Sequence, residues 1–166
     1  MFESNFVDFF SRIHYSVPLF IYIPAITFFI YRSIVMMDVS ILNTVLFLLL
    51  GVFVWSIAEY VIHRWVFHFH PKSEFMKKLH FMFHGVHHDF PQDSMRLVMP
   101  PAVSITLGFV FYGFFFWVFS FAGSIEFLAA YFAGFLIGYL FYDMMHYASH
   151  HSTSNNWYIK YIKDKH

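Results

Sequence analysis

Four stretches of this sequence are apolar over a length close to or above the roughly 20 residues that a helix needs to cross a bilayer. They cover about residues 17–37, 39–62, 101–121 and 125–145. The first is the weakest, because Pro18 and Pro24 interrupt it and Arg32 has to extend its charge to the membrane surface. We therefore predict an all-α fold, an integral membrane four-helix bundle.

The composition supports the membrane class and excludes others. The 166 residues predict a single domain covering 1–166, and 59% of them are hydrophobic, with a mean hydropathy of +0.57. The formal net charge is zero, so electrostatic capture of nucleic acid has no support. There is no cysteine, which leaves His, Asp and Glu as the residues able to hold a metal.

Short linkers and one glycine pair suggest how the spans pack. The linkers after the first and third spans have only a few residues, so we expect those neighbours to pair as hairpins. Gly134 and Gly138 form a GxxxG step on the fourth span. This step either allows close approach of another helix or is a chance occurrence.

The basic residues predict the orientation. With four spans, the N-terminus and the segments 63–100 and 146–166 lie on one side of the membrane. Nine of the ten Lys and Arg residues fall on that side, and Arg32 alone lies near the other. By the positive-inside rule this side faces the cytoplasm. The membrane would be the endoplasmic reticulum in a eukaryote or the inner membrane in a bacterium.

The twelve histidines gather at the ends of these spans. Seven lie between His63 and His88, and four more between His146 and His166. One interfacial histidine is usually a polar tip at the lipid headgroups, but this density favours a metal site, because neutral imidazole is the commonest metal ligand. Six or more ligands exceed the four of a tetrahedral zinc site, so two metals are expected. The two segments 63–100 and 146–166 would form a histidine-rich cytosolic cap.

The histidine spacings differ between clusters. His63 and His68 are five residues apart, which turns an ideal α-helix by about 500° and leaves the rings about 140° apart. Either the helix ends between them or they serve two metals. Steps of three and four align a second set on one helical face, and it contains His80, His84, His87 and His88. His146 and His150 stack in the same way, followed by His151.

Two carboxyl groups within the spans accompany these histidines. Glu59 lies four residues before His63, and Asp143 lies three before His146. Ionisable groups at such depth are costly and are rarely without a role. They are expected to accept a hydrogen bond from the second nitrogen of a ligand ring, which orients it. Local bonding to Tyr60, to Tyr142 or to the backbone is the alternative.

Four segments resemble the fatty acid 2-hydroxylase family. They are 59–68 (EYVIHRWVFH), 84–93 (HGVHHDFPQD), 96–101 (RLVMPP) and 138–151 (GYLFYDMMHYASHH). This family belongs to the fatty acid hydroxylase and sterol desaturase superfamily of membrane di-iron oxygenases. The RLVMPP segment resembles this branch more than the sterol enzymes.

The resemblance implies a site as well as a fold. The metal ligands that it implies are His63, His68, His84, His87, His88, His146, His150 and His166. It implies supporting roles beside the ligands for His80 and His151, whereas His14 and His70 match no ligand position. Asp93 and Arg96 are expected to bind the substrate headgroup, or else to anchor the chain at the interface.

The resemblance also implies an activity, O2-dependent hydroxylation at carbon 2 of a long acyl chain in a free fatty acid or an acyl lipid such as ceramide. Side-chain acids and bases cannot oxidise an unactivated C–H bond, so two metal ions are required, with iron expected and zinc as a possible bound species. Electrons would come from a separate protein, a b-type cytochrome or a ferredoxin-like donor. The alternatives are a sterol or carotenoid oxidase or hydroxylase, and a non-catalytic membrane protein that binds or transports metal.

One motif departs from the family pattern. The last motif of the family is H-x-x-H-H, and this chain ends at its first histidine, His166. We expect a truncated C-terminus, with two further histidines encoded beyond it. Otherwise the protein completes its site in another way or is inactive as given.

Overall fold

The computed structural model describes residues 12–67, 73–74, 77, 93, 95 and 97–151. Within these residues the chain is helical and contains no strand. The elements are α2 (Ser16–Tyr31) with the π-helical η1 (Arg32–Met36), α3 (Ile41–Ile62) with the π-helical η2 (His63–Phe67), α6 (Pro101–Phe121), the short 3-10 helix η4 (Ile125–Phe127) and α7 (Leu128–His151). Four of the described helices are long and apolar enough to span a membrane, which confirms the predicted four spans.

Local sequence explains where several helices begin. The Ser40 side chain accepts a hydrogen bond of 3.3 Å from the Asn43 N–H and so caps α3. Pro101 opens α6, where a missing N–H costs nothing. Gly123 provides a positive φ of 64° in the turn between α6 and η4. Capping and turn residues therefore determine where these helices begin and end, which the apolar content of the sequence alone does not determine.

Two helices extend past the ends expected from hydropathy. The fourth span continues as helix to His151, beyond the expected end near residue 145, so His146, His150 and His151 stand on its last turns. The second span continues as the π-helical η2 from His63. These histidines therefore lie on rigid helical ends, not in a separate loop.

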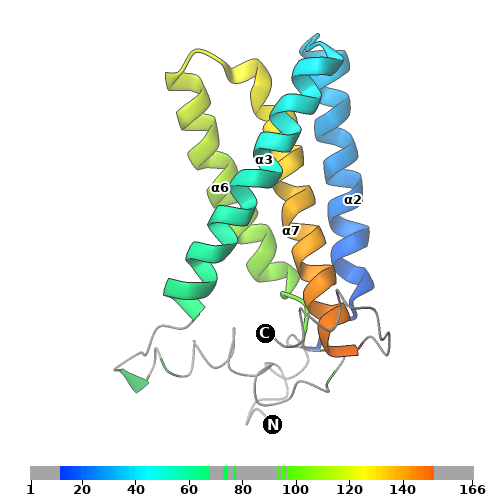
Figure 1. Cartoon of the computed structure of the whole chain (residues 1–166), viewed down its shortest axis with the longest axis vertical. Helices are drawn as coiled ribbons and strands as arrows, with labels where there is room; N and C mark the ends of the chain where they lie inside the picture. The colour runs from blue at the N-terminus through cyan, green and yellow to red at the C-terminus, as the bar shows by residue number, and fades with distance from the viewer. Residues whose placement is uncertain are drawn as a thin grey trace.

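Helix α7 is the centre of the bundle (Figure 1). Within its hydrophobic window 61% of the residues are buried, against 11–17% for the other three spans. Ala130 and Ala133 are fully buried, and their small size lets neighbouring backbones come close. The most extensive contacts of α7 are with α3, followed by those with α2, while α6 is attached more loosely. The expected hairpin pairing is wrong for α2 and α3, which pack chiefly on α7 instead of on each other, whereas α6 does pack on α7, the next span in the chain.

Glycines bring α3 and α7 together. A Cβ at Gly134 would meet the Leu48 backbone, and one at Gly51 would meet the Tyr131 carbonyl. A Cβ at Gly138 would lie 2.7 Å from the Trp55 side chain. The GxxxG step is thus confirmed as a site of close helix approach, and Gly51 is its counterpart on α3.

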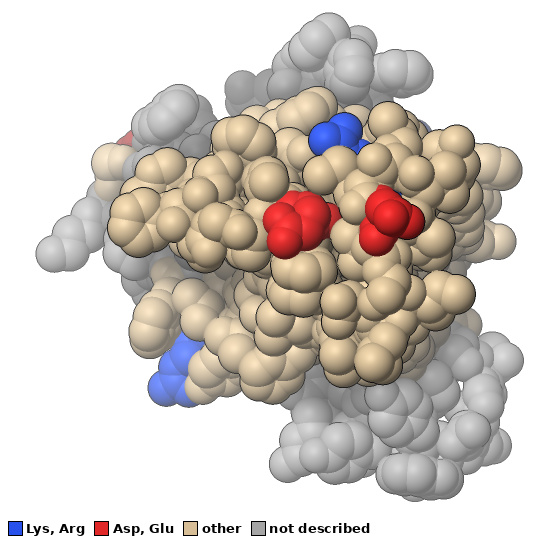
Figure 2. Space-filling view, turned by 90° about the horizontal axis from the view of Figure 1, so that it is seen from above, with Lys and Arg blue, Asp and Glu red and all other residues tan. Residues whose placement is uncertain are grey.

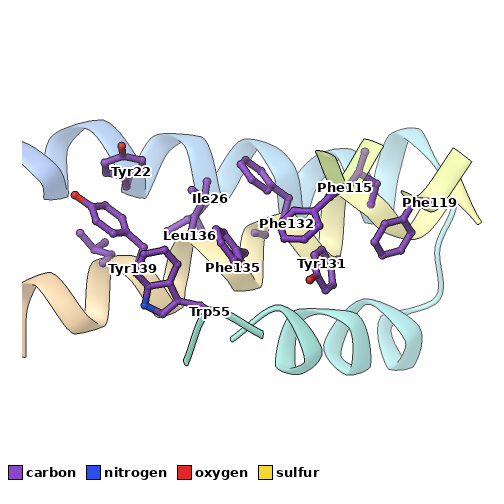
Figure 3. Close-up of a cluster of buried hydrophobic side chains, with 13 residues drawn as sticks. Tyr22, Ile26, Trp55, Phe115, Phe119, Tyr131, Phe132, Phe135, Leu136 and Tyr139 are labelled. Carbon is purple, nitrogen blue, oxygen red and sulfur yellow. The ribbon is translucent and has the colours of Figure 1, made fainter. Parts of the chain in front are cut away.

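Aromatic rings fill the space around α7 (Figure 3). Trp55 on α3 packs edge-on against Phe135, with ring centroids 5.0 Å apart. Tyr22 on α2 packs against Tyr139 at 4.9 Å, and Phe115 on α6 packs against Tyr131 at 4.8 Å. Edge-to-face pairs of this kind contribute about 0.5–1.5 kcal/mol each beyond burial. They supply packing that the hydrophobic effect does not supply between helices in lipid.

The two ends of the bundle differ in character. The helix ends that carry His63 and His146 lie at the same end of the bundle (Figure 1). At the opposite end, Figure 2 shows acidic side chains near the centre of the surface. The described loops there contain Asp38 and Glu126. This distribution agrees with the predicted charge bias, while the cytoplasmic orientation stays a prediction.

Candidate functional site

Glu59 and His63 form the α3 side of the candidate site. They are one helical turn apart, and Glu59 Oε1 lies 3.9 Å from His63 Nδ1. The side chain of Glu59 is only 13% exposed and that of His63 is 30% exposed. At 3.9 Å the two atoms are too far apart for a hydrogen bond, so the predicted bond that would orient the His63 ring stays a prediction.

Tyr142, His146 and His150 form a column of rings on α7. Tyr142 and His146 are stacked with centroids 6.0 Å apart, and His146 and His150 meet edge-on at 5.2 Å. The four-residue spacing accounts for the column, because residues i and i+4 lie above one another on a helix. The structure therefore brings two predicted ligands into direct contact.

Tyr142 also lies close to α3. Its side chain is near the Glu59 carboxyl group. Glu59, Tyr142 and His146 line one cavity of about 580 Å³ between α3 and α7. The predicted residues of α3 and α7 thus meet around a shared space at the histidine-bearing end. Among the described residues alone, no group of three His, Asp or Glu side chains could hold a metal ion.

Asp143 has different partners from those expected. It is buried, and its Oδ1 accepts a hydrogen bond of 3.3 Å from the Met99 N–H. The Tyr139 hydroxyl donates to Oδ2 at 3.4 Å. The bond from Met99, 44 residues away, attaches the segment before α6 to α7, whereas the bond from Tyr139 is local. A contact between Asp143 and a ligand ring stays a prediction.

Known proteins resemble this chain over nearly its whole length. Residues 48–166 match the fatty acid hydroxylase family. A dihydroceramide fatty acyl 2-hydroxylase of Arabidopsis thaliana is 36% identical, and the match covers 99% of this chain and 68% of that protein. The chain belongs to the fatty acid hydroxylase family.

Two further relatives of this chain support the resemblance to fatty acid 2-hydroxylases. A ceramide very long chain fatty acid hydroxylase of Schizosaccharomyces pombe is 35% identical over 92% of this chain and 43% of its own length. The solved structure of full-length scs7p, in which only the hydroxylase domain is visible, has a TM-score of 0.88 and 32% identity. That match covers 98% of this chain and 61% of the other, so the chain spans only part of these proteins. The predicted fold is confirmed.

The π-helical segment revises one argument about the hydroxylase-family ligands. The 140° angle between His63 and His68 assumed an ideal α-helix, but the chain is π-helical over His63–Phe67. In a π-helix the hydrogen bonds join residues five apart, so the 140° of an ideal α-helix does not hold for this segment. His68 lies outside the described residues, so whether it shares a metal with His63 stays a prediction. Single π turns occur often at functional sites.

Two predicted residues take part in local structure. His151 packs against Tyr147 at 5.0 Å, and Tyr147 stacks on Tyr15 at the start of α2. Asp93 accepts a hydrogen bond of 3.1 Å from the Met95 N–H. These contacts fit supporting roles at the histidine-bearing end, and a headgroup role for Asp93 stays a prediction.

The remaining predicted site residues lie outside the described part of the chain. They are His68, His80, His84, His87, His88, Arg96 and His166. Sequence reasoning named Tyr142 only as an alternative partner for the carboxyl groups and missed its position between Glu59 and His146. Its four-residue step before His146 is the signal that predicts the stacking. The proximity to Glu59 has no such signal, because it involves two helices about 80 residues apart in sequence.

Proposed function

We propose that this protein hydroxylates carbon 2 of a long-chain fatty acyl group, in a free fatty acid or an acyl lipid such as ceramide. It would use dioxygen and a histidine-bound pair of metal ions. The observation that carries the proposal is one cavity between α3 and α7 that Glu59, Tyr142 and His146 line, with His63 near Glu59 and His150 in contact with His146. Relatives named fatty acid 2-hydroxylase and ceramide hydroxylase support the reaction and the substrate class.

The described residues fit a metal site in their chemistry. Imidazoles four residues apart on one helix are a common chelating arrangement, and here the two rings are in contact. Glu59 supplies a carboxyl group near His63, and such a group commonly orients the ring of a histidine that binds a metal. We propose His63, His146 and His150 as ligands, joined by His68, His84, His87, His88 and His166. Imidazole suits iron and zinc alike, so iron follows from the reaction and zinc is a possible bound species.

The metal pair, when bound, would supply the oxidising power that side chains lack. The protein residues would position the metal ligands and shield the reacting carbon from water. Glu59 would orient the His63 ring, and Tyr142 lies near Glu59 on the facing helix. The apolar walls of the cavity exclude water from the reacting carbon. A separate electron donor, a b-type cytochrome or a ferredoxin-like protein, would reduce the site from the cytoplasmic side.

The organisation follows from the same proposal. Residues 1–166 form one membrane hydroxylase domain, with segments 63–100 and 146–166 contributing the histidine-rich cap. The host membrane is the endoplasmic reticulum in a eukaryote and the inner membrane in a bacterium. Both histidine-bearing helix ends lie at the same end of the bundle, which supports a single compartment for all ligands (Figure 1).

Oxygen labelling tests this function. Membranes from cells that express the protein are incubated with ¹⁸O2, and the extracted lipids are analysed by mass spectrometry. We expect ¹⁸O at carbon 2 of long acyl chains. Label in a sterol or carotenoid would overturn the proposal in favour of a related oxidase. Purified protein that holds metal but yields no oxidised lipid, with an active donor present, would favour a metal-binding or transport protein.

A pair of histidine variants tests the site. His150→Ala removes one ring of the α7 column and is expected to abolish the 2-hydroxy product and lower the metal content. His14→Ala is the matched control, because His14 is exposed and its side chain contacts the neighbouring residues Tyr15 and Ser16. Equal product and equal metal content in both variants would remove His150 from the site.

A further inference from the structure

We propose that the groove between α3 and α7 binds the acyl chain of the substrate, with the polar end of the lipid at His146. The α3–α7 groove is defined by Val52 and Ile137 at one end and by His146 and Ser149 at the other. This inference rests on the proposed function and adds where the substrate lies.

The shape of the groove follows from the glycine contact. At Gly51 and Gly134 the backbones of α3 and α7 touch, and slightly further along Gly138 packs on Trp55. Beyond these contacts the two helices diverge toward the histidine-bearing end (Figure 1). The divergence makes a wedge that is narrow deep in the membrane and wide near the histidines. Its α7 wall from Ile137 to Ser149 extends for about 18 Å along the helix axis.

The lining of the groove changes from apolar to polar along its length. Val52 and Ile137 occupy the deep end, whereas Glu59, Tyr142 and His146 lie near the wide end. The volume of about 580 Å³ is within the range of small-molecule sites. A long apolar chain with one polar end matches this gradient. Because carbon 2 is close to the polar end of an acyl lipid, this placement brings it near the His146 ring.

The groove is also accessible from the lipid phase. Two of its lining residues, Ser56 and Phe141, are exposed on the outer surface of the bundle, and Phe141 is 62% exposed. In a bilayer that surface faces acyl chains. A substrate can therefore enter sideways from the membrane without passing through water, and a chain longer than the groove continues into the bilayer.

A second cavity in the described region is too small for this occupant. It lies between all four spans, on the other side of Trp55, and is lined by Tyr22, Ser104 and Tyr139 among others. Its volume of about 40 Å³ has room for one or two water molecules. An acyl chain cannot enter it without separating α6 from α7. Of these two cavities among the described residues, the α3–α7 groove is therefore the one with space for the substrate.

Ser56 is the position at which the groove can be filled with least disturbance. Its side chain is exposed, and its hydroxyl donates only to the Val52 carbonyl of its own helix, at 3.2 Å. A tryptophan there would occupy the space of the acyl chain one turn from Glu59. Ile57 is the matched control, since it is the next residue on α3, is 49% exposed and does not line the groove.

The first experiment compares Ser56→Trp with Ile57→Trp. We expect Ser56→Trp to lower the 2-hydroxy lipid by about tenfold or more, because the chain can no longer reach its reacting position. Metal content should be unchanged. Ile57→Trp should stay within about twofold of the parent protein. Equal product from the two variants would overturn the groove as the acyl site.

The second experiment needs neither a variant nor turnover. The purified parent protein is illuminated with a long-chain fatty acid that carries a diazirine at mid-chain, with and without excess unlabelled fatty acid. We expect competable labelling of the α3 and α7 peptides that contain Ser56 and Phe141. Labelling confined to α2 and α6 would overturn the proposal. If the parent protein makes no 2-hydroxy product but labels at the groove, the proposed reaction fails and the lipid site stands.

Discussion

The two halves of the α3–α7 pair make an informative contrast. At the tight end, defined by Gly51, Gly134 and Leu48, the helices meet backbone to backbone and leave no room for one methyl group. At the open end, defined by Glu59, Tyr142 and His146, the same helices enclose a cavity lined by ionisable and polar groups. One half holds the bundle together while the other half leaves space. The residues that stabilise the bundle and the residues proposed for the reaction therefore lie on the same two helices, at different depths in the membrane.

The largest expected effect comes from breaking the tight end. Gly134→Ala places a Cβ on the Leu48 backbone, so α3 and α7 must separate. We expect the free energy of unfolding to fall by about 3 kcal/mol, as overpacking at a rigid contact does. Reversible unfolding of the purified protein in mixed micelles, followed by circular dichroism, measures it. Gly113→Ala on α6 is the control, because its Cβ meets nothing within 4 Å. Equal stability of the two variants would mean that the tight end does not hold the helices.

The open end should respond in function more than in stability. Glu59→Gln keeps the size of the side chain but removes the carboxylate beside His63 Nδ1. We expect metal affinity or product formation to fall by about 10–100-fold. Metal analysis of purified protein and lipid mass spectrometry provide the two readouts.

The matched control for this change is Glu74→Gln. Glu74 forms an exposed ion pair of 2.7 Å with Lys77 and should be nearly silent, because surface pairs contribute little. If Glu59→Gln proves as silent as Glu74→Gln, the carboxyl group has no role in orienting His63.

A substitution at Asp143 tests whether this residue contributes to the stability of the bundle or to the metal site. Asp143→Asn leaves one acceptor where Met99 and Tyr139 now use two, and it introduces an amide that needs new partners. We expect a loss of about 1–3 kcal/mol in the free energy of unfolding. Asp38→Asn is the control, since Asp38 has a φ of 51° that Asn adopts readily. A loss of metal without a loss of stability in Asp143→Asn would instead assign Asp143 to the metal site.

The smallest effect is expected beyond the tight end, where Ser33 and Thr44 join α2 and α3. Their buried hydroxyl oxygens lie 3.1 Å apart. A double-mutant cycle with Ser33→Ala and Thr44→Val should give a coupling of about 0.6 kcal/mol, the usual value between membrane helices. Thr106→Val is the control for Thr44→Val, because the Thr106 hydroxyl bonds within its own helix at 2.7 Å. A coupling free energy of zero would mean that this pair of hydroxyl groups does not stabilise the bundle, and that the stabilisation between helices comes from the glycine contacts.

Much of the site is predictable wherever it depends on spacing along one helix. The steps from Glu59 to His63 and from His146 to His150 both span one turn, so Glu59 and His63 lie on one face and the rings of His146 and His150 are in contact. The pairing of Asp143 with Met99 was not predictable in the same way. It joins residues 44 positions apart, and the backbone N–H that reaches the carboxyl group carries no signature in the sequence.

The sequence by itself determined the number of spans, the helical class and the gathering of the histidine-bearing ends. These properties depend on the length of apolar segments and on their even number, which are local or additive. Only the tertiary structure decided that α7 is central, that α3 is its main partner and that the pair opens into a groove. Those properties depend on which small residues meet across helices, as Gly51 and Gly134 do, and in lipid hydropathy does not distinguish one partner from another.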